Sequence, residues 1–154
     1  MRIPAGSSQI IALFAAAGSG LAMAFQGTVN SAAAREIGLG AITFIVALTG
    51  TIVSGMSLLA GYGTAGFSLS RLGQAPWWAY AGGPVGPIIT AAVAYSIHSA
   101  GVVNATTAII LGQLGTAALI DHMGWFGAEP IKFRLWKLAG IALVALGGKI
   151  LLDP

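Results

Sequence analysis

Cysteine is absent from this chain of 154 residues, and charged side chains are scarce. Without cysteine the chain can form no disulfide, no thiolate metal site and no cysteine nucleophile. Asp, Glu, Lys and Arg together make up 7% of the residues, whereas about 25% is usual for a soluble domain. A chain with so few charges could not cover its own surface in water, so we expect a membrane protein.

Motifs for catalysis and for nucleic-acid binding are lacking as well. The sequence contains no HExxH and no GxSxG, and no pair of carboxylates falls inside an apolar stretch. The net charge is +3, but no basic cluster is dense enough to indicate a nucleic-acid surface. We therefore expect a protein that is not an enzyme and that uses no cofactor, no metal and no nucleic-acid partner.

Hydrophobic residues are what the chain has in abundance: they make up 56% of it, and the mean hydropathy is +0.88. A membrane-spanning helix needs about 20 mostly apolar residues. Five such stretches can be traced, over residues 8–34, 41–62, 76–97, 102–120 and 135–152. The short break His98-Ser99-Ala100-Gly101 predicts a tight antiparallel hairpin. We expect one all-α membrane domain, residues 1–154, with the bilayer as its solvent.

An odd number of spans puts the two ends of the chain on opposite sides of the membrane. Five of the seven Lys and Arg fall on the N-terminal side, and Arg35 and Lys149 fall on the other. The positive-inside rule then favours a cytoplasmic N-terminus. The first stretch can also be interpreted as a signal peptide cleaved after Ala24. However, its apolar character continues to Val29, which is long enough to span.

Amide side chains interrupt two of the predicted spans. Gln26 and Asn30 are four residues apart and share one helical face. Gln113 lies in the fourth span, with Thr106 seven residues earlier on the same face. An amide in hydrocarbon needs a polar partner or a water-filled cavity. The three amides can therefore be packing contacts or substrate-binding residues, and the residues alone leave both alternatives open.

Aromatic residues open the third span. Trp77 and Trp78 are suited to the lipid–water interface, where aromatic belts sit. The alternative is that they stack on a substrate.

Glycine and proline follow directly. Gly82 and Gly86 form a small-xxx-small pair that lets another helix approach closely, and Gly83 lies beside them. Pro84 and Pro87 each remove a hydrogen-bond donor from the helix. The result is either a simple kink or a helix break that lines a cavity, as in many transporters.

Asp121 and His122 stand side by side after the fourth apolar run. One interpretation is a turn, in which Asp121 bonds local backbone and Gly124 and Gly127 adopt positive φ. The other is proton coupling, since a carboxylate beside an imidazole can take up and release a proton near neutral pH.

Several stretches together resemble the YdcZ-type family, a five-span branch of the drug/metabolite transporter superfamily. They are, in order, "AFQGTVN", "TFIVALTGT", "PWWAYAGG", "GQLGTAALIDHMGWFG" and "RLWKLAGIALVALGGKIL". The fourth is the most specific. The family typically has Pro and Leu before the glycine that opens the fourth span, where this chain has His98-Ser99-Ala100. The residues that match are Gln26, Asn30, Gly82, Gly83, Gln113, Asp121, His122 and Gly124.

The resemblance implies a bacterial inner-membrane protein related to one half of a ten-span transporter. It suggests a secondary transporter of a small metabolite or drug-like molecule. Its site would lie at the midplane of an antiparallel dimer, formed with a second copy or with a paralogue. The alternative function is a non-transporting subunit that packs with a partner protein. Because no carboxylate lies inside a span, neutral or amphipathic substrates are favoured over permanent cations.

Overall fold

The computed structural model describes residues 5–61, 73–127, 130–131 and 135–152. Five helices account for most of them: α1 (Ala5–Ile37), α2 (Leu39–Leu59), α4 (Gly82–Ala100), α5 (Val102–Met123) and α6 (Leu135–Leu152). Two short 3-10 segments flank the α4–α5 pair, namely η1 (Trp77–Tyr80) and η2 (Trp125–Gly127). Among the described residues, Gln9–Ile37, Leu39–Leu59 and Val102–Met123 are long and apolar enough to cross a membrane. The prediction of an all-α membrane protein with five helices is confirmed.

Two helices run further than their apolar stretches. α1 continues through Arg35 and Glu36 to Ile37, and α5 continues through Asp121 and His122 to Met123. Thus the Asp–His pair lies on the helix, beyond the apolar stretch that we traced over residues 102–120. A helix ends where the backbone can turn, and not where hydrophobicity stops. α5 ends at Gly124, whose left-handed φ of 64° suits a residue without a Cβ.

Single glycines join the helices into two hairpins. Gly38 (φ 88°) lies between α1 and α2, and Gly101 (φ 83°) lies between α4 and α5. The N–H of Gly38 donates to the carbonyl of Ala34 at 3.0 Å, and that of Gly101 donates to the carbonyl of Ile97 at 2.9 Å. Residues with a Cβ rarely adopt such φ values, which explains why glycine stands at both turns. The predicted hairpin between the third and fourth spans is confirmed.

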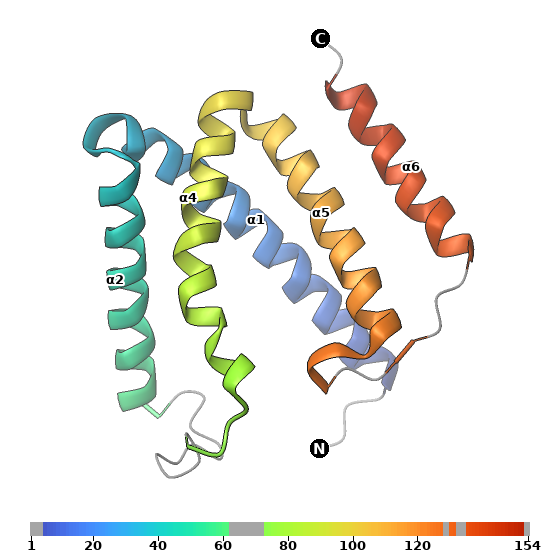
Figure 1. Cartoon of the computed structure of the whole chain (residues 1–154), viewed down its shortest axis with the longest axis horizontal. Helices are drawn as coiled ribbons and strands as arrows, with labels where there is room; N and C mark the ends of the chain where they lie inside the picture. The colour runs from blue at the N-terminus through green and yellow to red at the C-terminus, as the bar shows by residue number, and fades with distance from the viewer. Residues whose placement is uncertain (1–4, 62–72, 128–129, 132–134, 153–154) are drawn as a thin grey trace.

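The helices form a row with one helix behind it (Figure 1). α2, α4, α5 and α6 stand side by side in that order, and α1 crosses behind them on a diagonal. α1 packs against α2, α4 and α5, whereas α6 packs mainly against α5. Both glycine turns lie at one end of the row, with the end of α6, and α1 begins at the opposite end.

Few side chains are buried within the chain. The buried hydrophobic residues that the structure describes are Ile42, Ala94, Ile97 and Ala105. Large apolar residues lie outside, as at Leu59, which is 91% exposed. Lipid tails are as apolar as these side chains, so in a bilayer there is little drive to bury them.

Two other glycines allow the helices to touch. A Cβ built on Gly27 of α1 would lie 2.8 Å from both Val93 Cγ1 and Ile97 Cδ1 of α4. A Cβ on Gly148 of α6 would lie 2.6 Å from Thr107 Cγ2 of α5. Small residues at a crossing are how membrane helices gain van der Waals contact. These two glycines therefore define the α1–α4 and α5–α6 contacts.

The Gly148→Ala substitution is expected to destabilise the protein by about 1–3 kcal/mol, because the added methyl overpacks the α5–α6 contact. Thr107 is β-branched and has little rotamer freedom in a helix, so it cannot move aside easily. Gly147→Ala is the matched control, since a Cβ there meets nothing within 4 Å. The free energy of unfolding in mixed detergent micelles measures both, and equal effects of the two variants would contradict the contact.

Candidate functional site

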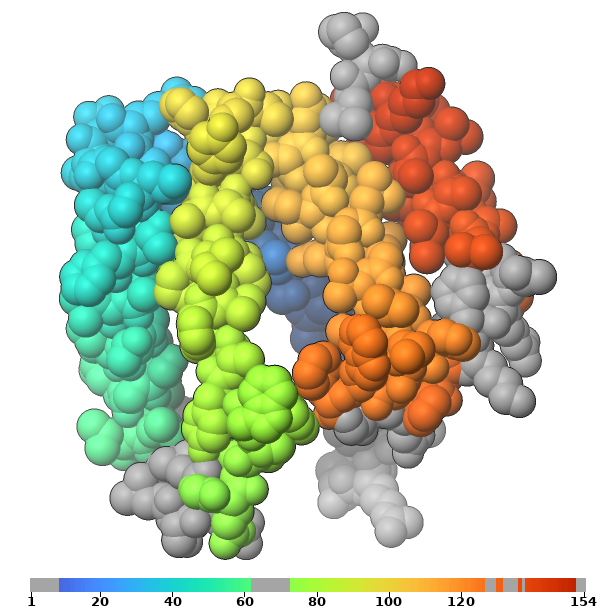
Figure 2. All heavy atoms as spheres, viewed as in Figure 1, coloured from blue at the N-terminus to red at the C-terminus, as the bar shows by residue number. Residues whose placement is uncertain are grey.

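A hollow lies between α1, α4 and α5, with a volume of about 190 Å³. We call it the inner hollow. Figure 2 shows the opening between α4 and α5, with α1 visible at its floor. The residues that line it are Gly20, Met23, Ala24, Val93, Ile97, Thr106, Ile109, Ile110 and Gln113.

The lining of the inner hollow is apolar apart from two polar side chains on α5. Gln113 and Thr106 both contribute to it, as their shared helical face predicts. The Gln113 amide has no hydrogen-bond partner among the residues that the structure describes. No Asp, Glu, Lys, Arg or His belongs to the lining. The lining can therefore present one amide and one hydroxyl to a ligand, and the rest of its surface is apolar and uncharged.

Gln26 and Asn30 lie elsewhere. Both line an open groove formed by one face of α1, which confirms that they share a helical face. Asn30 is only 5% exposed, whereas Gln26 is exposed. Met23 lines both this groove and the inner hollow. The structure therefore does not bring the three amides into one site within a single chain.

Aromatic side chains join η1, which precedes α4, to η2, which follows α5. The rings of Trp78 in η1 and Phe126 in η2 meet edge to face with centroids 5.5 Å apart, and Trp125 stands 6.4 Å from Phe126. Phe126 has φ 58°, a left-handed value that we had expected at Gly127. Trp77 points outward and is 83% exposed. Neither Trp77 nor Trp78 lines the inner hollow.

The glycine and proline residues of the third span lie at the start of α4. Pro84 is the third residue of the helix, where its missing N–H has no helical partner to lose, and the helix continues through Pro87. A Cβ at Gly82, Gly83 or Gly86 would meet nothing within 4 Å. Within the described chain these glycines make no close helix contact.

Asp121 and His122 line two different hollows, each formed by residues of α5 and α6. Asp121 lines one together with Trp136 and Val144, and His122 lines the other together with Leu138. The carbonyl of Asp121 also accepts a 2.8 Å hydrogen bond from the N–H of Ile131, so this residue anchors the chain that leads to α6. This bond is made by the main chain and tests neither interpretation of the Asp121 side chain, so local backbone bonding by that side chain and proton coupling by Asp121 and His122 both stay predictions.

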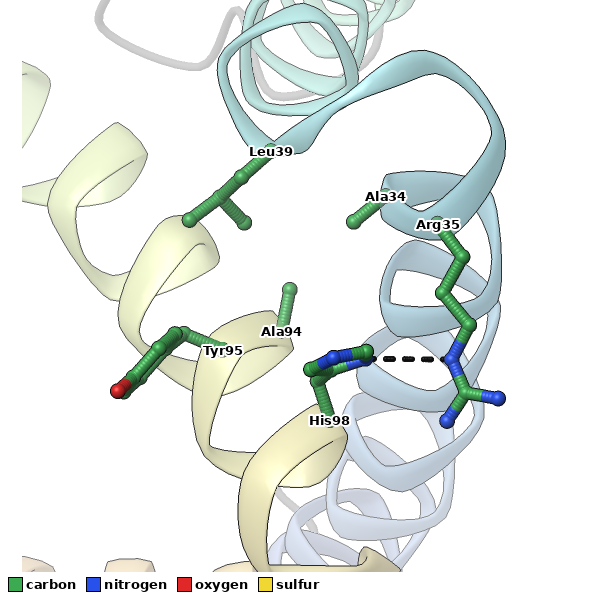
Figure 3. A pocket seen from close by; sticks show the side chains of 6 residues that line it. All are labelled: Ala34, Arg35, Leu39, Ala94, Tyr95 and His98. Carbon is green, nitrogen blue, oxygen red and sulfur yellow. Dashed lines mark hydrogen bonds between the residues drawn. The ribbon is translucent and has the colours of Figure 1, made fainter.

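A further polar pair lies at the opposite end of the molecule. Arg35 Nε donates a 3.2 Å hydrogen bond to His98 Nδ1, which joins the last turns of α1 and α4 (Figure 3). Sequence reasoning missed this pair, whose members are 63 residues apart. A signal was present: each residue stands three positions before a turn glycine, Gly38 or Gly101, and so falls at the same end of its hairpin.

Comparisons with known proteins address the family of the chain. We found no match to it among curated proteins or among solved structures. A family model described as "Putative inner membrane exporter, YdcZ" matches residues 11–150. That match covers nearly the whole chain, including all of α2, α4 and α5. The chain therefore belongs to this YdcZ family of inner-membrane proteins.

Proposed function

We propose that the chain is an exporter subunit that carries a small neutral or amphipathic molecule through the inner hollow. The observation that carries the proposal is the lining of that hollow, where Gln113 and Thr106 face an otherwise apolar, uncharged space between three helices. Ligand sites are typically apolar with a few placed polar groups. A permanent cation would require a counter-charge, which this lining does not offer.

The size of the hollow supports a dimer. Sites for drug-sized ligands measure about 300–1,000 Å³, whereas the inner hollow holds about 190 Å³. A second chain would enlarge the space. It would also cover Gln26, an exposed amide that costs free energy against lipid. Gly82, Gly86 and Gly112 leave open space for a close-packed helix from that second chain.

We propose that the second chain is another copy inserted in the opposite direction. With five helices, the start of α1 and the end of α6 lie at opposite ends of the molecule. Two parallel copies would therefore form an assembly whose two membrane faces differ. Inverted copies instead give a two-fold axis in the membrane plane, the symmetry that alternating access uses in many transporters. Copies with the N-terminus inside are expected to be the more numerous, given the charge distribution.

Cysteine labelling is expected to detect both orientations. The chain has no cysteine, so Gln74→Cys and Ser99→Cys each introduce one thiol, at opposite ends of the α4 segment. In sealed vesicles of cells expressing only this chain, an impermeant maleimide should label each position from both faces, in complementary fractions. Labelling of each position from a single face, with a functional dimer still formed, would exclude the inverted homodimer and leave a paralogue as partner.

Transport itself is tested with purified protein in proteoliposomes. Nile red, a neutral amphipathic dye, is expected to be exported faster from these vesicles than from protein-free ones, and ethidium, a permanent cation, is expected not to be. Export of neither dye under any imposed ion gradient would favour the alternative function, a subunit that only packs with a partner protein.

A further inference from the structure

We propose that His98 is a proton-binding site that controls the contact between α1 and α4, with Arg35 as its positioning residue. The proposal extends the proposed function by supplying a coupling ion, and it places that site away from Asp121 and His122. It starts from the hydrogen bond between Arg35 Nε and His98 Nδ1.

The direction of this hydrogen bond fixes the protonation state of His98. A guanidinium is always protonated and can only donate. His98 Nδ1 must therefore accept, which leaves the imidazole neutral with its proton on Nε2. The contact is complete only while Nδ1 keeps its lone pair.

Proton uptake reverses the contact. A proton from water binds the Nδ1 lone pair, so two N–H groups and two positive charges then face each other across the former 3.2 Å hydrogen bond. The attraction between the last turns of α1 and α4 becomes a repulsion. Histidine is the side chain whose charge ordinarily changes between about pH 5 and 8.

Few other ionisable groups surround this contact. Glu36 follows Arg35 on α1 and is exposed, but the guanidinium forms no ion pair with a described carboxylate. Tyr95 on α4 lines the same small pocket, and its hydroxyl points away from Arg35 in Figure 3. α2 contains no ionisable residue, Tyr80 of η1 precedes the start of α4, and Asp121 and His122 fall at the far end of α5. Among the described residues, Arg35 is thus the charged group that lies against His98.

The α1–α4 contact at Gly27 links this site to the inner hollow. Val93 and Ile97 lie so near Gly27 that a Cβ there would come within 2.8 Å of both. Arg35 lies eight residues further along α1, which is about 12 Å of helix. On the other side of Gly27, Gly20 and Ala24 line the inner hollow. Separation of the helices at Arg35 with the Gly27 contact as pivot therefore shifts the α1 wall of the hollow.

The test measures the α1–α4 separation directly. Spin labels on cysteines placed at Ala32 and Ser99, both exposed, report the separation through dipolar broadening of the spectrum. In protein reconstituted in nanodiscs, the broadening should decrease as the pH is lowered from about 8 to 5. His98→Asn keeps an acceptor near the Nδ1 position but cannot titrate, so its spectrum should not change with pH. His122→Asn, the control at the other histidine, should keep the response, and Arg35→Gln should weaken it because the repelling charge is gone.

Either of two results overturns the proposal: a wild-type spectrum that is the same at both pH values, or a response that persists in His98→Asn. The first needs no variant and so does not depend on how a variant folds. The outcome is also separate from that of the proposed function. If Nile red is exported while the spectrum is independent of pH, the proton site fails and the function stands. If the spectrum responds while no dye is exported, the function fails and the proton site stands.

Discussion

Replacement of Gly20 by leucine is expected to lower Nile red export at least tenfold. A Cβ built at Gly20 meets no atom within 4 Å, and Gly20 is a lining residue of the inner hollow, so we expect a leucine side chain there to extend into it. A four-carbon side chain occupies a large part of a space of about 190 Å³. Because the side chain fills space and does not displace packed atoms, insertion and stability should stay close to those of the unmodified protein.

Gly18→Leu is the matched control for this prediction. It stands two residues away on α1, also has open space around its Cβ, and does not line the inner hollow. The same side chain on the same helix should therefore leave export nearly unchanged. Equal losses in the two variants would mean that bulk on α1, and not occupation of the hollow, limits export.

Gln113→Leu is expected to reduce the apparent affinity for an exported molecule by about 10- to 100-fold. The substitution keeps the volume and removes the hydrogen bonds that an amide gives a ligand, each worth about 1–3 kcal/mol when its partner is left buried and unpaired. Gln113 has no described partner within the chain, so packing loses little. Concentration-dependent export from proteoliposomes measures the effect.

Thr107→Val serves as the control for Gln113. This hydroxyl lies on the same helix, but its side chain is buried against Gly148 and does not line the inner hollow. Its loss should affect the stability of the α5–α6 contact and not the affinity for the exported molecule. A Gln113→Leu variant with unchanged affinity would assign the amide to helix packing, where its contribution to stability is about 0.6 kcal/mol.

The helices were predictable from the sequence, because each apolar stretch must form a helix to satisfy its own backbone in lipid. The residues at which the helices end were less predictable. The helix α1 extends through Arg35 and Glu36 and α5 extends through Asp121 and His122, because polar residues near an interface do not end a helix. The turn glycines marked the true ends at Gly38, Gly101 and Gly124 through their positive φ.

The site was predictable only in part. The shared face of Gln113 and Thr106 follows from helical periodicity, and both line the inner hollow. Periodicity along one helix cannot say which helix stands opposite. The diagonal course of α1 sends Gln26 to a separate groove, and the contacts of Gly27 and Gly148 depend on side chains from other helices. The Arg35–His98 hydrogen bond needs two hairpins to pack before it exists.

Because each of these two turns is a single glycine, few polar residues have to cross the bilayer while the chain is being synthesised. The ionisable residues beside the α1–α2 turn are Arg35 and Glu36, a pair of opposite charge, and the one beside the α4–α5 turn is His98. On insertion scales a lone Arg or Lys at mid-membrane costs about 2.5–3.5 kcal/mol. The inverted dimer that we propose requires a nascent hairpin to enter the membrane from either face, and a turn with so few charged residues favours this. We expect the few basic residues at the opposite end to bias which face each new chain enters from, and not to forbid the other.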